Sequence, residues 1–134
     1  MKHFTLRLED AATSREIAQV SSFVGQDRSG SFGILPGHAR MMASLVTGLA
    51  RFRVNSGEFT YLATPGALLY FNEDLLRVTT RHYFLDSDYM RIIQTLEQQL
   101  AEEEKVLRST KRSLHRMEEE VFKRLWEMGR GAAG

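Results

Sequence analysis

Histidine is the side chain of this sequence best suited to proton transfer near neutral pH. His38 lies in the segment Gly33–Ala39, directly after Pro36 and Gly37. Its unperturbed pKa of about 6.5 would suit a general base, but the neighbouring sequence offers neither a nucleophile nor a paired carboxylate. We therefore interpret His38 as a histidine hydrogen-bonded within a turn, and we expect a protein that is not an enzyme.

The remaining candidates for metal or redox chemistry form no pattern typical of a site. The four histidines, His3, His38, His82 and His115, are far apart and lack ligand spacing. The chain has no cysteine, which excludes disulfides and thiolate metal sites and leaves the redox compartment undetermined. The sequence therefore predicts no catalytic residue and no metal.

Length and charge restrict the classes of protein further. A chain of 134 residues fits one domain, or one small domain with an appendage. A net charge of +1 gives no indication of a nucleic-acid partner. Residues 1–7 contain no apolar run of signal-peptide length, and no stretch has the roughly 18 apolar residues that would span a bilayer. We expect a soluble, cytoplasmic protein that reaches a membrane only through a partner.

The first 85 residues have the pattern of a β-domain. Phe4, Leu6 and Leu8 alternate with polar residues, which is typical of a half-buried strand. Short apolar runs follow, separated by Gly, Asn, Asp and Pro turns such as Gly33–Ala39 and Asn55–Glu58. A parallel sheet would need crossover helices, which this half lacks. The sequence predicts an antiparallel β-sandwich or barrel over residues 1–85.

Two arginines on one predicted strand deserve a separate prediction. Arg51 and Arg53 alternate along the run 49–54 and therefore share one face of that strand. Two interpretations stay open: the face is simply solvated, or it contacts acidic residues of a partner.

Residues 86–128 contain no Gly and no Pro and consist mainly of good helix formers. Asp86, Ser87 and Asp88 predict an N-cap and acidic residues in the first turn. Apolar residues recur every seven positions, namely Ile93, Leu100, Leu107, Leu114, Val121 and Met128. Such a narrow stripe needs a partner helix. We expect either a helix hairpin with a turn near Ser109, or one helix about 65 Å long. Residues 129–134 are expected to be a flexible tail.

A longer run of residues resembles a known family. Residues 29–39, Ser-Gly-Ser-Phe-Gly-Ile-Leu-Pro-Gly-His-Ala, are similar to a signature of the epsilon subunit of rotary F-type ATP synthases. Residues 58–62 with the turn at 65–66, and residues 75–80, resemble later strands of the same domain. The resemblance covers about residues 4–85. It implies a non-catalytic rotor subunit of the central stalk that couples ion flow through the c ring to ATP synthesis.

The resemblance also implies partners and their contact residues. The loop expected to face the c ring contains Arg28, Ser29, Gly30, Ser31 and Phe32. The turn expected near the gamma subunit contains Pro36, Gly37 and His38. The helical tail would contact the catalytic alpha and beta subunits and inhibit ATP hydrolysis, through Arg108, Lys111, Arg112, Arg116, Phe122 and Trp126. The protein would lie peripherally on the cytoplasmic face of the cell inner membrane.

Asp88 and Arg91 match the Asp-x-x-Arg element through which some members of the family bind ATP, which makes ATP a candidate regulatory ligand. The same spacing is also that of an ordinary helix-surface ion pair.

The helical tail is rich in Glu, Arg and Leu, whereas the tail of the family is rich in alanine. This difference indicates an alternative, sodium-type lineage. The coupling ion, proton or sodium, stays open. The alternative function is a β-sandwich interaction module with a coiled-coil oligomerisation tail.

Overall fold

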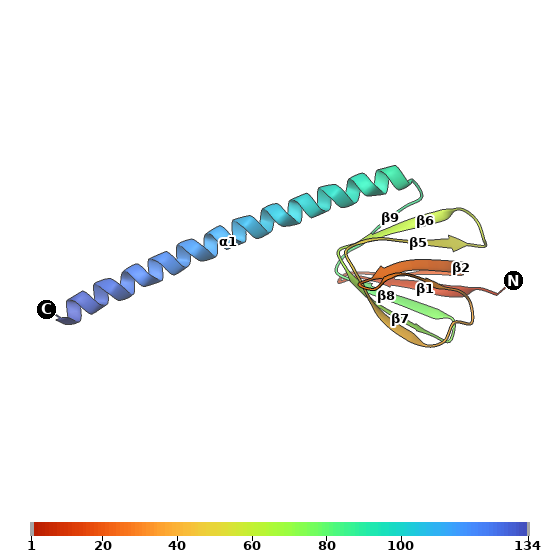
Figure 1. Cartoon of the computed structure of the whole chain (residues 1–134), viewed down its shortest axis with the longest axis horizontal. Coiled ribbons are helices and arrows are strands. Elements are labelled where there is room, and N and C mark those ends of the chain that lie inside the picture. The colour runs from red at the N-terminus through yellow and green to blue at the C-terminus, as the bar shows by residue number, and fades with distance from the viewer. Residues whose placement is uncertain (1, 134) are drawn as a thin grey trace. The chain divides into compact units, whose positions relative to one another are not determined.

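Alternating apolar and polar residues generate most of the strands in the structure, which is a computed structural model. Within residues 2–133, which it describes, the chain forms nine strands and one helix (Figure 1). The strands are β1 (Phe4–Glu9), β2 (Ser14–Asp27), β3 (Gly30–Ile34), β4 (Met41–Leu45), β5 (Gly48–Val54), β6 (Phe59–Thr64), β7 (Ala67–Asn72), β8 (Leu75–Thr80) and β9 (Phe84–Asp86). The helix, α1, spans Tyr89–Ala133. The predicted β-sandwich followed by a helical segment is confirmed.

The strands form one folded sheet in the order β4-β7-β8-β1-β2-β5-β6-β9, with β3 paired to β2. Neighbouring strands are antiparallel, except that β1 and β8 run parallel, with Thr5 opposite Leu75. This parallel pair was not expected from the sequence. It needs no crossover helix, because the chain returns to β1 through the six strands between them.

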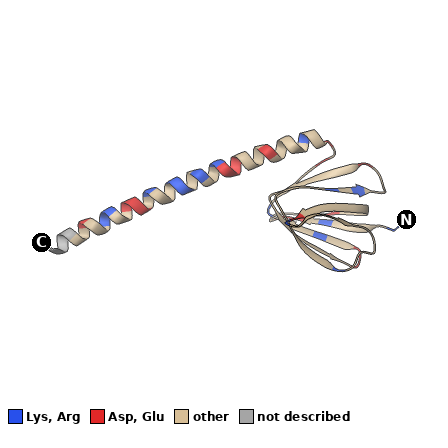
Figure 2. Cartoon of the chain, viewed as in Figure 1, with Lys and Arg blue, Asp and Glu red and all other residues tan. Residues whose placement is uncertain are grey.

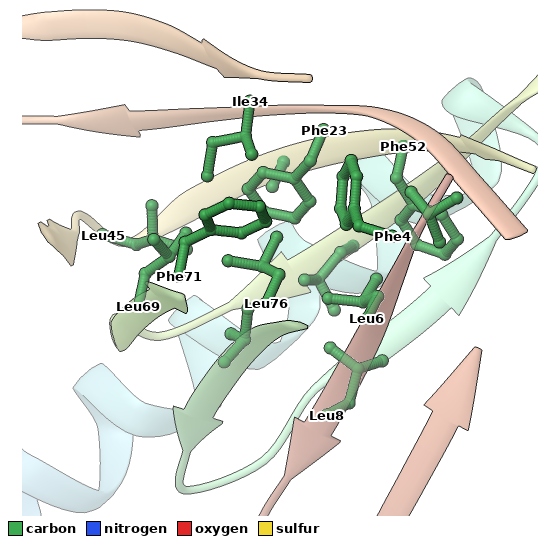
Figure 3. Close-up of a cluster of buried hydrophobic side chains, with 14 residues drawn as sticks. Phe4, Leu6, Leu8, Phe23, Ile34, Leu45, Phe52, Leu69, Phe71 and Leu76 are labelled. Carbon is green, nitrogen blue, oxygen red and sulfur yellow. The ribbon is translucent and has the colours of Figure 1, made fainter. Parts of the chain in front are cut away.

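The core lies between the two halves of this folded sheet (Figure 3). Its buried members are Phe4, Leu6, Leu8, Val20, Phe23, Ile34, Leu45, Ala50, Phe52, Leu62, Leu69, Phe71, Leu76 and Val78. The rings of Phe4 and Phe71 meet edge to face with centroids 5.6 Å apart. Each large apolar side chain contributes about 1.5–3 kcal/mol when fully buried, so this cluster makes the sandwich a stiff unit.

Contacts divide the chain into two units, one up to Glu97 and one from Gln98. The first two turns of α1 therefore belong to the sandwich unit. Ile92 is completely buried, and the rings of Tyr61 and Tyr89 lie 5.3 Å apart. The predicted boundary at residue 85 lies within β9, whereas the contacts divide after Glu97 in α1.

Helix α1 is continuous through Ser109 and Thr110, so the structure has the single long helix rather than the hairpin. The Thr110 hydroxyl is accommodated within the helix, since Oγ1 donates a hydrogen bond to the carbonyl oxygen of Val106 at 3.0 Å. The expected acidic residues of the first turn are a wrong prediction: α1 begins at Tyr89, and Asp86 and Asp88 precede it. The helix also continues through residues 129–133 of the expected flexible tail, and Gly134, the last residue of that prediction, lies outside the described residues.

Charges of both signs alternate along α1 (Figure 2). Among the described residues, no helix combines the length and apolar content that crossing a bilayer requires.

Candidate partner-binding surfaces

The turn between β3 and β4 is held by hydrogen bonds at both ends. Gly37 has a φ of +80°, which L side chains rarely adopt. The backbone N–H of His38 donates to the carbonyl oxygen of Leu35 at 3.1 Å, and that of Gly37 donates to Oδ1 of Asp74 at 2.7 Å. Since Asp74 lies in the hairpin turn between β7 and β8, the Pro36–His38 turn is fixed to a second part of the sandwich.

His38 is hydrogen-bonded within this turn, as the sequence indicated. Its Nδ1 lies 2.7 Å from the carbonyl oxygen of Ala39, and its ring lies edge-on to Phe71 with centroids 5.9 Å apart. No group of three His, Asp or Glu side chains that could hold a metal ion occurs in the described part of the chain. The imidazole of His38 is thus held against the backbone of the turn and against Phe71 on β7.

Exposed apolar side chains lie on β4, on β7 and in the turn that precedes β4. Met42 on β4 and Leu68 on β7 point away from the core and are 72% and 64% exposed, and Leu35 in the turn is 62% exposed. Tyr70 lies opposite Met42, and the guanidinium of Arg40 lies 5.6 Å from its ring centroid. We call Leu35, Met42, Leu68 and Tyr70 the apolar face. Apolar side chains with an aromatic and an arginine are the composition found at the centre of protein interfaces.

The loop expected to face the c ring is a tight turn followed by a strand. Oδ1 of Asp27 accepts hydrogen bonds from the backbone N–H and the hydroxyl of Ser29, at 2.8 and 2.6 Å. These bonds hold the pKa of Asp27 below its usual value. Gly30, Ser31 and Phe32 belong to strand β3 rather than to the loop, and Phe32 packs against the core. Arg28 and Ser29 therefore form the tip of this turn.

Two further loops lie beside that tip. A cleft of about 730 Å³ is lined by residues of three segments distant in sequence, including Arg28, Ser29, Thr47, Pro65 and Gly66. The Thr47 hydroxyl donates to the carbonyl oxygen of Pro65 at 2.7 Å, which joins two of these loops. The sequence indicated the turn at 65–66 but did not place it beside Arg28 and Thr47, because only the sheet order brings these segments together.

Asp88 and Arg91 do not form the surface ion pair that their spacing suggests. Asp88 is the N-cap of α1, and its Oδ1 accepts the backbone N–H of Arg91 at 3.2 Å. The Arg91 side chain instead donates to both carboxylate oxygens of Asp86, at 2.5 and 2.7 Å. Arg91, together with the backbone N–H of Asp88, lowers the pKa of Asp86 to about 2. The pair therefore ties the end of β9 to the first turn of α1.

The tail residues expected to contact the catalytic head all lie on α1 and are exposed. They are Arg108, Lys111, Arg112, Arg116, Phe122 and Trp126. Phe122 and Trp126, 71% and 62% exposed, lie one turn apart on the same side of the helix. Nη2 of Arg108 lies 2.6 Å from Oε1 of Glu104, a surface pair of little energetic weight.

Comparison with known proteins identifies the sandwich. A model of the family described as ATP synthase, Delta/Epsilon chain, beta-sandwich domain matches residues 5–85. The chain belongs to this family. The residues matched are those of β1 to β8 and the start of β9, so the delta/epsilon domain coincides with the folded sheet and excludes α1. A comparison with curated protein sequences gives no significant match.

Two solved structures of ATP synthases share the fold of this delta/epsilon chain. One is in the Euglena gracilis mitochondrial ATP synthase, OSCP/F1/c-ring in rotational state 1, with a TM-score of 0.59 and 17% identity. That match covers 75% of this chain and 66% of the other. The second, in the central stalk/c-ring of the Tetrahymena thermophila mitochondrial ATP synthase, has a TM-score of 0.52 and 12% identity, and covers 63% and 69% of the two chains. This chain thus spans just under two thirds of the Euglena chain.

Proposed function

We propose that this chain is the epsilon subunit of the central stalk of an F-type ATP synthase, without an active site of its own. The observation that carries the proposal is family membership over residues 5–85. In this role the sandwich binds the gamma subunit and the c ring, and the rotor couples ion flow through the ring to ATP synthesis in the catalytic head. A rotor part must resist deformation, and the closely packed core supports that requirement.

The apolar face and the Pro36–His38 turn are the surface we assign to the gamma subunit. Leu35, a member of the apolar face, directly precedes the turn, and Asp74 holds the turn in place before any partner binds. A preformed surface loses little conformational entropy on binding. The tip formed by Arg28 and Ser29, together with Thr47 and Pro65, is the surface we assign to the c ring. It is similarly fixed, by the hydrogen bonds of Asp27 and Thr47.

Binding to the gamma subunit tests the proposal directly. We expect the chain, co-expressed with gamma from the same source, to purify as a stable complex at micromolar concentration. The double variant Met42→Glu/Leu68→Glu should weaken this complex at least tenfold, because it places two charges in an apolar contact. Leu107→Glu/Leu114→Glu on α1 is the matched control and should bind normally. Failure of the unmodified chain to bind gamma would refute the assignment.

The long helix is proposed to reach the catalytic alpha and beta subunits and to restrain ATP hydrolysis. Its exposed Phe122 and Trp126, with the nearby arginines, support a contact with another subunit. If the helix inhibits, the assembled enzyme should hydrolyse ATP faster when this chain ends at Glu97. An unchanged rate would discard the inhibitory role.

ATP as a regulatory ligand of Asp88 and Arg91 stays a prediction. The Arg91 guanidinium is already paired with Asp86, so ATP would have to displace that carboxylate. Calorimetric titration with ATP, on this chain and on Asp86→Asn, checks the prediction.

Within the assembly the protein would be peripheral, on the cytoplasmic face of the cell inner membrane. The coupling ion, proton or sodium, would be selected by other subunits.

A further inference from the structure

We propose that the outer face of β5 and β6 binds an acidic segment of a partner protein through Arg51 and Arg53. Ala50 and Phe52 point into the core, so the two arginines between and after them point outward. Arg51 lies opposite Tyr61 and Arg53 opposite Phe59 in the antiparallel pair. We call Arg51, Arg53, Phe59 and Tyr61 the arginine face. It is distinct from the surfaces assigned above, and the proposal does not depend on the proposed function.

Both guanidinium groups are held over one aromatic ring. The Cζ atoms of Arg51 and Arg53 lie 4.8 and 3.9 Å from the centroid of the Phe59 ring. The Nε atom of Arg53 is enclosed and has no hydrogen-bond partner. Stacking of this kind restricts a long side chain before a ligand arrives, so less entropy is lost when the guanidinium binds one.

Neither arginine is neutralised within the described part of the chain. Three other arginines of the sandwich unit have carboxylate partners: Arg7 and Arg77 reach Glu9, and Arg91 reaches Asp86. Arg51 and Arg53 form no such pair among the described residues. Glu58 lines a cleft together with Arg53 but forms no ion pair with it, and Asp86 is paired with Arg91. Two fixed positive charges therefore remain available.

A shallow cleft lies beside Arg53. It measures about 450 Å³ and is lined by Arg53, Gly57, Glu58, Phe59, Tyr61 and Ser87. Carboxylates are the natural ligands, because a guanidinium can bind them with two parallel hydrogen bonds. Alternate residues of a strand lie about 6.5–7 Å apart. Acids at alternate positions of an extended segment, or one turn apart on a helix, match that separation.

The composition of the face favours a protein partner over a nucleic acid or a lipid surface. Two arginines and a net charge of +1 provide too few cations for a polyanion, whose affinity depends on many phosphate contacts. Arginine and tyrosine are, by contrast, enriched among the residues that dominate protein–protein binding energies.

The test uses the full-length chain labelled for NMR and two capped peptides, one of alternating Glu and Thr and one of alternating Gln and Thr. We expect the Glu peptide to shift backbone amide signals of β5 and β6, and to bind at least several-fold more weakly when salt rises from about 50 to about 300 mM. The Gln peptide should cause no such shifts. Shifts that lie on other strands, or equal binding of both peptides, would overturn the proposal.

Charge variants distinguish binding at Arg51 and Arg53 from nonspecific electrostatic attraction of the peptide to the chain. Arg51→Gln/Arg53→Gln should weaken binding of the Glu peptide roughly tenfold or more, whereas Arg15→Gln/Arg81→Gln, with the same loss of charge, should not. Arg51→Lys/Arg53→Lys keeps the charge and the fold but loses the paired donors, and should bind with intermediate affinity. If Arg51→Gln/Arg53→Gln shifts the amide signals of residues 98–129 without peptide, the occupant is the chain's own helix and the proposal is wrong.

Discussion

At the scale of single residues, Gly37 determines the conformation of the turn between β3 and β4. Its positive φ and its hydrogen bond to Asp74 together fix the turn. A Cβ atom at this position would meet no heavy atom within 4 Å. Any effect of a substitution must therefore come from the backbone conformation rather than from crowding.

Gly37→Ala should destabilise the chain by about 1–2 kcal/mol, because an L residue pays a steric penalty in the left-handed region. Urea unfolding followed by circular dichroism measures this difference. Gly129→Ala, on the helix, is the matched control and should be neutral or slightly stabilising. A neutral Gly37→Ala would mean that the turn adapts without strain.

Residue-level reasoning found the turn but misassigned one ion pair. The sequence indicated that Asp88 and Arg91 share a helix surface, which assumes that both lie inside the helix. Because α1 begins at Tyr89, Asp88 becomes the cap, and its carboxylate points to a backbone N–H. Asp86 then lies at the end of a strand, within reach of Arg91. A three-residue strand such as β9 has no periodicity from which this could be predicted.

At the scale of elements, the Asp86–Arg91 pair connects β9 to α1 and should respond to acid. The pKa of Asp86 is lowered to about 2 from 3.8 in the folded chain. The pair therefore stabilises the fold above about pH 4, and this stabilisation is lost as the pH falls toward 2. The difference in unfolding free energy between the unmodified chain and Asp86→Asn should shrink over that range.

Carboxyl NMR titration checks the same contact independently. In the variant Arg91→Gln, the titration midpoint of the Asp86 carboxyl should rise toward its ordinary value. The reason is that the hydrogen bonds from Arg91 are the largest cause of the lowered Asp86 pKa. An unchanged midpoint would mean that the N–H of Asp88 alone holds the carboxylate.

The elements themselves were predicted unevenly, for physical reasons. Strands with clear alternation, such as β1 and β8, follow directly from the sequence. The sequence predicted strand β3 only in part, because Gly30 and Gly33 have low strand propensity. Backbone pairing with β2 holds this segment in its extended conformation. The cleft lined by Arg28, Thr47 and Pro65 depends on sheet order, which no local pattern encodes.

At the scale of the whole molecule, the sandwich unit includes the first turns of α1. Ile92 is fully buried, and Ala63 on β6 is buried although its neighbours Phe59 and Tyr61 on the same face are partly exposed. Neither Ala63 nor Ile92 belongs to the main core cluster. These observations indicate a small second apolar cluster between β6 and the start of the helix.

Two truncations test that cluster. A chain ending at Glu97 should unfold with a free energy within about 0.5 kcal/mol of the full chain. A chain ending at Asp86 should lose about 2–4 kcal/mol, from the burial of Ile92 and the ring contact of Tyr89. The single tryptophan, Trp126, is absent from both, so circular dichroism is the suitable probe. Equal stability of the two truncations would contradict the second cluster.

The parallel pairing of β1 with β8 also has a consequence for the order in which the protein is made. Strand β1 can join β2 soon after both leave the ribosome, but its opposite edge stays open until β8 has been synthesised. An unpaired edge strand is a template for aggregation, and such long-range pairing is slow. The nascent chain is therefore most vulnerable before residue 80 emerges, and the long helix that follows gives the sheet time to close while the chain is still attached.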